Sequence, residues 1–282
     1  MGKGLGLIGN FKGKVGNVVG YHLTDSNNKQ TQGVRVYQPV VKNPRTYAQA
    51  EQRMRMSVIN ATYRALKSVI DRGQETKAYG NASRLAWLSR AMKSFEGPYF
   101  VKGEQPSYLA PLEISRGSLS PIDAYTNSEN AIRFILDGTV EENTLTVADF
   151  SQKLMQVYPF IQSGDQITFV GCSQTLAYVK SVIVDADDTT IMRGCYVTSG
   201  IFSAHAAFVS GSGNERDLEL GCVIVSREGS NGAHLRSTAS LVRVDGTIQD
   251  NLFTDAARRA AILSYMQEGT STDWPTEQQP VE

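Results

Sequence analysis

The stretch from residue 9 to residue 73 constrains the fold of this 282-residue chain more than any other. It begins with the run GNFKGKVGNVVGY at residues 9–21, in which short apolar segments alternate with glycine and lysine. It continues through Asn43, Pro44, Arg45 and Thr46 into a segment whose apolar residues have helical spacing. These two patterns predict a β-hairpin followed by a long helix.

The predicted helix has two alternative starts. Thr46 followed by Gln49 fits a capping box, whereas Pro44 after Asn43 fits the first helical position. In either case Gly73 supplies the stop.

This helix combines an apolar stripe with a basic side. At about 100° per residue, the stripe comprises Tyr47, Ala48, Val58, Ile59, Thr62, Leu66, Val69 and Ile70. The opposite side carries Arg53, Arg64 and Lys67, with Arg45 at its edge. Glu51 and Arg55, four residues apart at the border of the stripe, are expected to form an ion pair. The stripe predicts contact with a core, and the basic side is either merely solvated or binds anions.

Short strands and a second helix are also predicted in the first hundred residues. Residues 5–8 and 15–23 have the pattern of short strands, and a loop at 25–29 predicts a hairpin that returns through residues 32–37. A second helix is predicted at residues 81–95, with Leu85, Leu88 and Met92 at helical spacing and Asn81 or Ser83 as its cap.

The remainder is predicted to be mainly strands. Apolar, β-branched runs separated by turn residues lie at 131–136, 166–170, 177–184, 218–225 and 235–244, after a strand and turn at 112–119. Helices are predicted at 148–158, after a Thr146 cap, and at 254–267. The fold class is therefore α+β, with an N-terminal β-hairpin and two helices followed by a mainly antiparallel β-sandwich or barrel-like domain and a C-terminal helix.

Composition suggests four segments. Residues 97–128 contain four of the nine prolines and few helix signals, so we place the junction there. The segments are a basic module at 1–99, a linker with a strand at 100–128, a β-rich domain at 129–269 and a polar tail at 270–282.

Charge is divided unevenly between these segments. Residues 1–99 contain 16 Lys and Arg against 5 Asp and Glu, whereas residues 100–282 contain 12 against 23. A division this large is expected when one part binds a polyanion, or when the basic part of one copy meets the acidic part of another. Neutralisation within the monomer is the third explanation.

Segments that resemble catalytic or cofactor-binding motifs lack either the required neighbouring elements or the required residue spacing. Residues 4–9 match the dinucleotide pattern GxGxxG but have neither a strand before them nor a helix after them. Residues 9–15 are one residue short of a phosphate loop and have Val15 where Ser or Thr is required. The acidic turn at 185–188 lacks the glycine and glutamate of a calcium loop, and the histidines and cysteines lack zinc spacing. We therefore expect no enzyme, no metal and no cofactor.

The cysteines and the apolar runs of the sequence bear on where the protein is located. Cys172, Cys195 and Cys222 are odd in number and widely spaced, which disfavours a disulfide framework and favours a reducing cytoplasm. No targeting signal is recognised at the N-terminus, and no apolar run approaches the length that spans a bilayer. We expect no membrane partner.

Aromatic and basic residues alternate near the N-terminus in a pattern that favours nucleic-acid binding. The aromatic residues are Phe11, Tyr21, Tyr37, Tyr47 and Tyr63, of which Phe11 and Tyr63 are better interpreted as residues that fill a core under the hairpin. The predicted nucleic-acid-binding residues are Lys12, Lys14, Lys29, Arg35, Lys42, Arg45, Arg53, Arg64 and Lys67. No sequence-reading motif is present, so binding would be directed at the backbone and sensitive to salt.

Four segments of the N-terminal half carry a resemblance to a known family: GNFKGKVGNVVG at 9–20, Val34-Arg35, NPRTYAQAEQR at 43–53 and Ser115-Arg116-Gly117-Ser118-Leu119. In these segments the chain resembles a family of unknown function encoded by gut bacteria and their phages. The resemblance covers the strand-rich remainder only loosely and implies no catalytic residues. It implies a phage or mobile-element protein, located in the cytoplasm of the bacterial host or in the virion.

Two functions remain open at this point. The first is nucleic-acid binding without sequence specificity, with DNA favoured, through the basic N-terminal module. The alternative is a structural virion protein, such as a capsid, connector or tail-associated subunit, that assembles through its oppositely charged parts. Both predict a homo-oligomer or a larger assembly.

Overall fold

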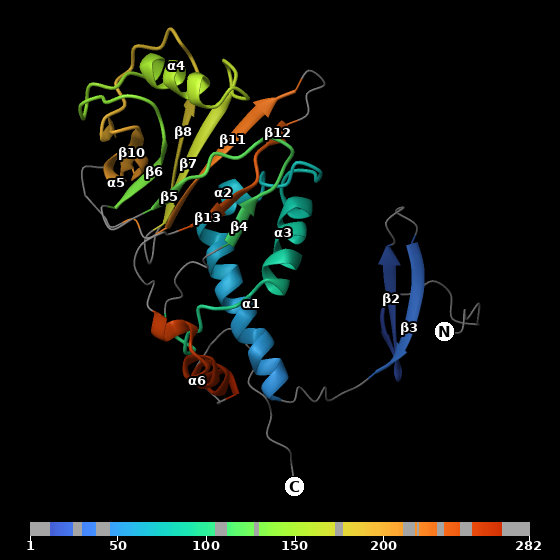
Figure 1. Cartoon of the computed structure of the whole chain (residues 1–282). Helices are drawn as coiled ribbons and strands as arrows, with labels where there is room; N and C mark the ends of the chain where they lie inside the picture. Colours follow the sequence, from blue (N-terminus) through green and yellow to red (C-terminus); the bar gives the residue numbers. More distant parts are fainter. Residues whose placement is uncertain are drawn as a thin grey trace. The chain divides into compact units, whose positions relative to one another are not determined.

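A computed structural model describes residues 12–24, 30–37, 46–104, 112–126, 130–172, 177–210, 218, 220–229, 234–242 and 250–266 (Figure 1). The contacts divide the chain into two units. One unit is formed by residues 1–45 with 271–282, and the other by residues 46–270. We call the described part of the first unit the hairpin unit and the second unit the body.

The hairpin unit is a three-stranded antiparallel sheet in the order β1 (Gly13–Val15), β2 (Val18–Thr24) and β3 (Gln30–Val36). Gly16 has a φ of 60°, which favours glycine, in the turn that joins β1 to β2. The predicted return of the hairpin is confirmed, because β2 and β3 pair along their whole length. The strand predicted at residues 5–8 lies outside the described residues.

The long helix of the body begins where one of the two predicted caps places it. Helix α1 (Tyr47–Ala65) has Thr46 as its N-cap, and the Thr46 hydroxyl accepts a hydrogen bond from the Gln49 amide at 3.4 Å. A short helix, α2 (Lys67–Ile70), follows before the chain reaches Gly73.

Most of the predicted apolar stripe of α1 is buried. Val58, Ile59, Thr62 and Leu66 have almost no exposed surface. The first turn was wrongly included in the stripe, because Tyr47 is exposed. At that end of α1 the buried positions are Ala50 and Met54, which pack in the same core as Ala261 and Ile262.

The second helix, α3 (Asn81–Lys93), is confirmed, but its predicted cap is wrong. Gly80 occupies the N-cap position with a φ of 84°, and neither Asn81 nor Ser83 caps the helix with its side chain. The Ser83 hydroxyl instead donates to the carbonyl of Ile70 at 2.6 Å, which ties α3 to α2. Trp87 is the largest buried residue of this helix, whereas Leu85 is exposed.

The strands of the body form three antiparallel sheets. The first has the order β5 (Tyr125–Thr126), β6 (Ala131–Ile135), β10 (Ile201–His205) and β9 (Cys195–Thr198). The second has the order β12 (His234–Arg236), β11 (Leu220–Glu228), β7 (Gln166–Cys172) and β8 (Ala177–Ile183). The third pairs β13 (Ala239–Leu241) with β4 (Leu112–Ser115). The remaining elements are α4 (Val147–Val157), α5 (Ala206–Ser210), the 3-10 helix η1 (Asp250–Phe253) and α6 (Asp255–Met266).

The β9–β10 hairpin was not predicted from the sequence. Ser199 and Gly200 join its strands with φ values of 51° and 79°, and Thr198 pairs with Ile201. Positive φ at both central positions is typical of a tight two-residue hairpin turn. Ser-Gly is a weaker signal for such a turn than Asn-Gly, which explains the omission.

The central strands of the β12-β11-β7-β8 sheet, β7 and β11, are covered on both faces. Phe169 and Val223 pack in one core with α4 and the β5-β6-β10-β9 sheet, whereas Val170 and Ile224 pack in a second core with α1, α3 and α6. Neighbouring residues of each strand thus point into different cores, so the strands are apolar without alternation. The α+β class with antiparallel sheets and a C-terminal helix is confirmed, and the sheets in the described part of the chain do not close into a barrel.

The division by contacts differs from the segments suggested by composition. Helices α1 and α3 belong by charge to the segment 1–99, yet Met54 and Trp87 share a core with Cys222 of β11. The boundary between the two units therefore falls at residues 45 and 46. Charged side chains show which face of a helix is in contact with solvent, whereas buried apolar side chains determine which elements pack into one core.

Two glycines allow close packing at one end of the central sheet. Gly171 and Gly221 are partners across β7 and β11. A Cβ atom added at Gly221 would lie 2.7 Å from a methyl carbon of Thr126, and one at Gly171 would lie 2.8 Å from a methyl carbon of Leu218. Both positions therefore require glycine for space rather than for backbone freedom.

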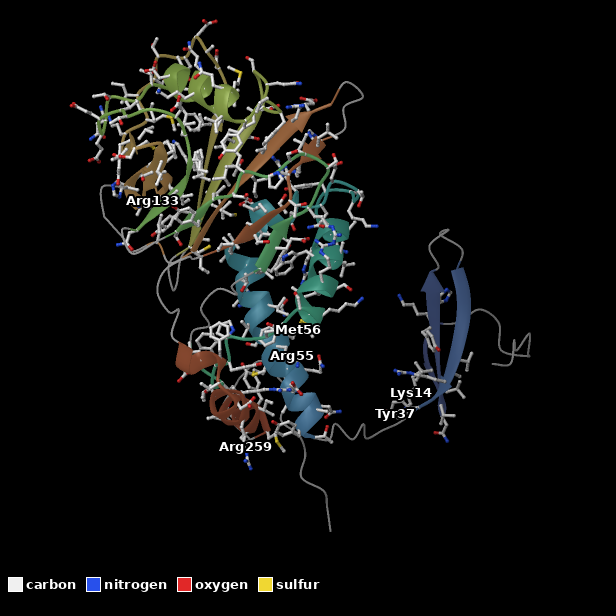
Figure 2. The ribbon with its side chains drawn as sticks, in the orientation of Figure 1. Lys14, Tyr37, Arg55, Met56, Arg133 and Arg259 are labelled. Carbon is white, nitrogen blue, oxygen red and sulfur yellow. The ribbon has the colours of Figure 1, made fainter. Side chains whose placement is uncertain are left out.

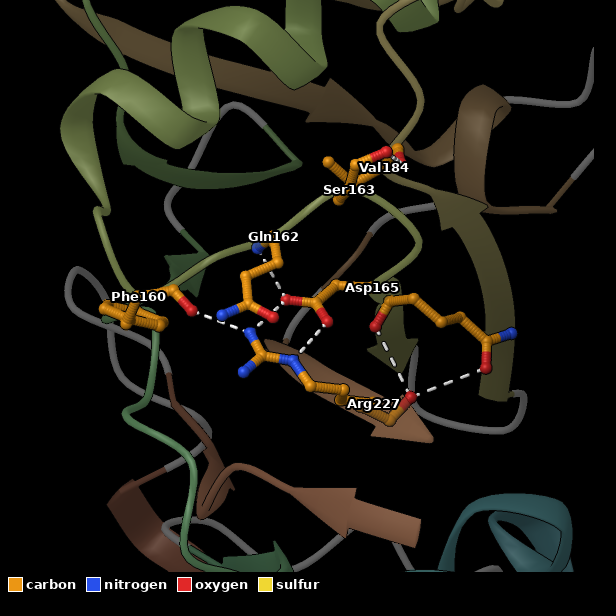
Figure 3. A network of polar contacts seen from close by, with 8 residues as sticks. Phe160, Gln162, Ser163, Asp165, Val184 and Arg227 are labelled. Carbon is orange, nitrogen blue, oxygen red and sulfur yellow. Dashed lines mark hydrogen bonds and ion pairs between the residues drawn. The ribbon is translucent and has the colours of Figure 1, made fainter. Parts of the chain in front are cut away.

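A buried ion pair fixes the segment before β7. Arg227 of β11 donates to both carboxylate oxygens of Asp165, at 2.6 and 2.7 Å, and to the carbonyl of Phe160 at 2.7 Å (Figure 3). The Asp165 carboxylate also accepts from the amide of Gln162 at 2.9 Å. The hydrogen bonds to Asp165 raise the pKa of Arg227. The donors and acceptors of these groups are paired with one another, so the ion pair has a structural role.

Candidate nucleic-acid interface

One face of the hairpin sheet is basic. Lys14 of β1 and Arg35 of β3 both pair with Val19 of β2, so the three residues form a row across the sheet. Residues in one row of a sheet project to the same side. Lys14 and Arg35 are exposed, and the strand register alone brings these two cations to one face.

Two tyrosines belong to the same face. Tyr21 lies over Gly33, its partner in β3, so closely that a Cβ atom at Gly33 would be 2.4 Å from the ring. Tyr37 follows β3, and its amide donates to the carbonyl of Asn17 at 2.7 Å. The Nζ atom of Lys14 lies 3.6 Å from the centre of the Tyr37 ring (Figure 2). This cation–π contact orders a lysine that would otherwise be mobile.

The other face of the hairpin sheet is apolar. Val15, Val18 and Val36 form a row across the three strands, and Val34 lies on the same side. The exposed fractions of Val15, Val34 and Val36 are 52%, 58% and 73%. We call these four residues the valine face. A sheet of this size with an exposed apolar face lacks a core of its own.

The described residues of the hairpin unit include no aspartate or glutamate. Lys12, Lys14 and Arg35 therefore have no acidic side chain in the described part of this unit to offset their charge. Cations on one face of this kind add to the diffusional attraction of a polyanion.

The structure brings some of the predicted binding residues together and separates others. Lys12, Lys14 and Arg35 belong to the hairpin unit. Arg53, Arg64 and Lys67 belong to α1 and α2 of the body. The other three predicted residues, Lys29, Lys42 and Arg45, lie outside the described residues.

The cations of α1 and α2 differ in their exposure and in whether they already have a partner. Arg64 is exposed, and Arg53 is half-buried and engaged in an interaction with its surroundings. Lys67 forms an ion pair with Asp71, and its hydrogen bond to the Asp71 carboxylate raises the pKa of Lys67. Lys67 is therefore less available for a phosphate than Arg64.

The ring of Tyr63 is part of the body rather than of a binding surface. Its hydroxyl donates to the carboxylate of Asp71 at 2.8 Å, and the guanidinium of Arg84 lies 4.7 Å from the ring centre. Tyr63 also packs against the core that contains Trp87. Tyr63 packs against the core of the body and not in a core under the hairpin as predicted, whereas Phe11 lies outside the described residues.

Two observations in the described residues concern catalytic and metal chemistry. Cys195 is fully buried, and burial raises the pKa of its thiol, which disfavours a nucleophile beside His205. The described residues contain no group of three His, Cys, Asp or Glu side chains that could hold a metal ion. No helix within the described ranges is long and apolar enough to cross a membrane.

Sequence reasoning found the cations but missed their neighbours. The contact between Lys14 and Tyr37 and the packing of Tyr21 on Gly33 both depend on strand register. The only signal in the sequence was the alternation of basic and aromatic residues.

Comparison with known proteins gives no relative from which a function can be transferred. A scan against protein-family models, a search of curated proteins and a search of solved structures each returned no match. The resemblance to a phage-associated family of unknown function therefore stays a prediction from the sequence.

Proposed function

We propose that this chain binds nucleic acid without sequence specificity, DNA being favoured, through the basic face of the hairpin unit. The observation that carries the proposal is the row of Lys14, Val19 and Arg35 beside two tyrosines, on a sheet whose described residues include no acid. Cations that contact phosphates and aromatic rings that stack on bases are the usual parts of a surface that binds single strands.

The same face accounts for the expected lack of sequence specificity. Lysine and arginine contact phosphates, which are identical along the strand, and rings stack on any base. The described part of the hairpin unit contains no helix that could enter a major groove. Binding is therefore expected to weaken steeply with salt.

The proposal is tested by fluorescence polarisation with labelled single- and double-stranded oligonucleotides over a salt series. The variant Lys14→Ala/Arg35→Ala is expected to bind at least about tenfold more weakly, and the slope of log K against log salt is expected to fall by about 2. The matched control, Lys180→Ala/Arg193→Ala, removes two exposed cations from the body and should bind like the parent.

Two results would contradict the proposal. One is the absence of binding by the parent chain at low salt. The other is an equal loss in the two variants, because it would mean that overall charge rather than the basic face governs binding.

A second function is favoured by a different observation. The valine face leaves apolar side chains in water, and exposed apolar patches mark interaction sites. A structural virion protein, such as a capsid, connector or tail-associated subunit, would cover this face with a second copy of the chain. The division of charge along the sequence is compatible with such an assembly.

A further inference from the structure

Residues 267–282 carry a charge opposite to that of the hairpin unit. This segment, QEGTSTDWPTEQQPVE, follows α6 and lies outside the described residues. It has no lysine or arginine, and its acidic residues are Glu268, Asp273, Glu277 and Glu282. Residues 1–45 contain seven lysines and arginines and a single acid, Asp25. We call residues 267–282 the acidic segment, and its charge attracts it to the basic N-terminal part of the chain.

The basic face of the hairpin unit is the surface that this charge fits. Lys14 and Arg35 lie in one row of the sheet, and the described residues of the unit include no aspartate or glutamate. In the body, by contrast, Lys67 is paired with Asp71. Cations without an acidic neighbour attract an acidic segment more strongly than cations that already have a partner, so the basic face is favoured.

The spacing of the acids suits the row of cations. Lys14 and Arg35 lie on either side of β2 and are therefore about 10 Å apart, twice the distance between neighbouring strands. Asp273 and Glu277 are four residues apart in the sequence, which is about 13 Å in an extended chain. The long side chains of lysine and arginine cover this difference. Trp274, between the two acids, adds an aromatic ring of the kind that packs on a guanidinium.

The acidic segment is long enough to reach this face within one chain. Arg258 of α6 donates to Glu51 of α1 at 2.6 Å. Since Met266 and Thr46 lie about 12 and 8 Å from these two residues along their helices, the acidic segment starts within roughly 30 Å of Thr46. Its 16 residues span up to about 50 Å when extended, and residues 38–45, which join the hairpin unit to the body, span up to about 26 Å. These tethers give an effective concentration on the order of millimolar.

We propose that the acidic segment binds the basic face of the hairpin unit and competes with nucleic acid for it. Carboxylates present to Lys14 and Arg35 the same sign of charge as phosphates do, and the Trp274 ring presents a flat face as a base does. The inference rests on the proposed function, because it names a regulator of the same face. A basic face that is occupied by the acidic segment for most of the time binds nucleic acid more weakly, in proportion to the fraction that is free.

The first experiment measures this contact without nucleic acid. We call the full chain with the following substitutions the neutral variant, because its own segment cannot compete: Asp273→Asn, Glu277→Gln and Glu282→Gln. A fluorescein-labelled peptide of residues 267–282 is titrated with the neutral variant and followed by fluorescence polarisation. At low salt, half-saturation is expected below about 500 μM, that is, below the effective concentration within one chain.

The same titration shows which surface the peptide binds. Adding Lys14→Ala/Arg35→Ala to the neutral variant is expected to weaken peptide binding at least about fivefold, because two ion pairs are lost. Equal binding to the two proteins would overturn the inference, and so would the absence of peptide binding at low salt.

The second experiment measures competition. The neutral variant is expected to bind a labelled single-stranded oligonucleotide about threefold or more tightly than the parent at low salt, because its basic face is free. The control Asp137→Asn/Glu141→Gln/Glu142→Gln removes three exposed acids from the body, changes the net charge equally and should bind like the parent. A neutral variant that binds no more tightly than this control would show that the acidic segment does not compete.

The two experiments separate this inference from the function on which it rests. If neither the parent nor the neutral variant binds oligonucleotides at low salt, the proposed function fails, and the peptide titration still decides whether the acidic segment binds the basic face. If both bind oligonucleotides equally and the peptide does not bind, the proposed function stands and the inference is wrong.

Discussion

Glu51, Asp71 and Glu75 are each held in their ionised form by specific donors. Hydrogen bonds to Arg258 and then to Arg55 lower the pKa of Glu51 against the opposing effect of burial. Asp71 is almost fully buried, which by itself would raise its pKa, but bonds from Lys67 and Tyr63 lower the pKa on balance. Each carboxylate joins elements of the body, so its charge contributes to folding.

These pKa shifts predict that the body is less stable in acid. A carboxyl group whose folded pKa is below its unfolded value contributes stability above the unfolded pKa, and this contribution is lost as the pH falls through the folded pKa. The ordinary pKa of Glu75 is 4.5. We expect the free energy of unfolding in urea to fall between pH 5 and pH 3.

Glu75→Gln is expected to flatten this pH dependence and to lower the free energy of unfolding at pH 7 by about 1 kcal/mol, because the amide accepts hydrogen bonds less strongly than the carboxylate. Glu141→Gln, at an exposed position, is the control and should behave like the parent. A pH profile of Glu75→Gln that matches the parent would contradict the role assigned to the carboxylate.

The strands of the hairpin sheet alternate as if one face were buried, yet the valines of that face are exposed. Its register places cations with tyrosines on one face and valines on the other. In a globular domain the valine face would lie against a core, as the stripe of α1 does. The second function proposed above would cover this face with a second copy of the chain.

Val36→Asp is the variant that tests this inference, since Val36 is the most exposed member of the valine face. If copies of the chain associate through this face, light scattering after size-exclusion chromatography should give a multimer for the parent and a monomer for Val36→Asp. Lys12→Asp, which introduces the same side chain outside the valine face, should leave the multimer intact. A parent chain that is monomeric at about 100 μM would exclude association through this face.

For the molecule as a whole, the division into two units at residues 45 and 46 has a consequence for stability. The cores of the body are built from residues after Thr46, and the C-terminal helix α6 contributes Ala261 and Ile262 to one of them. The hairpin unit contributes nothing to these two cores.

A chain that lacks residues 1–45 is therefore expected to unfold within about 2 °C of the full chain, whereas loss of residues 255–266 should prevent cooperative unfolding. Circular dichroism during heating measures both. The shorter chain lacking 1–45 should also lose oligonucleotide binding. A large drop in its unfolding temperature would show that the two units stabilise each other.

The sequence alone determined the features that depend on residues close in the chain. The Thr46 and Thr146 caps, most of the stripe of α1 and the ion pair between Glu51 and Arg55 all follow from spacings of three or four residues, and all are present. The strand order did not follow, because pairing joins segments far apart in the chain.

Only the tertiary structure decided which charges meet. Arg258 joins Glu51 from 207 positions away, and Arg227 joins Asp165 from 62 positions away. The unit to which α1 belongs was decided in the same way, since its basic side suggested a link with the hairpin while its apolar stripe packs in the body. Charge and periodicity are properties of short segments, whereas burial is a property of the folded chain.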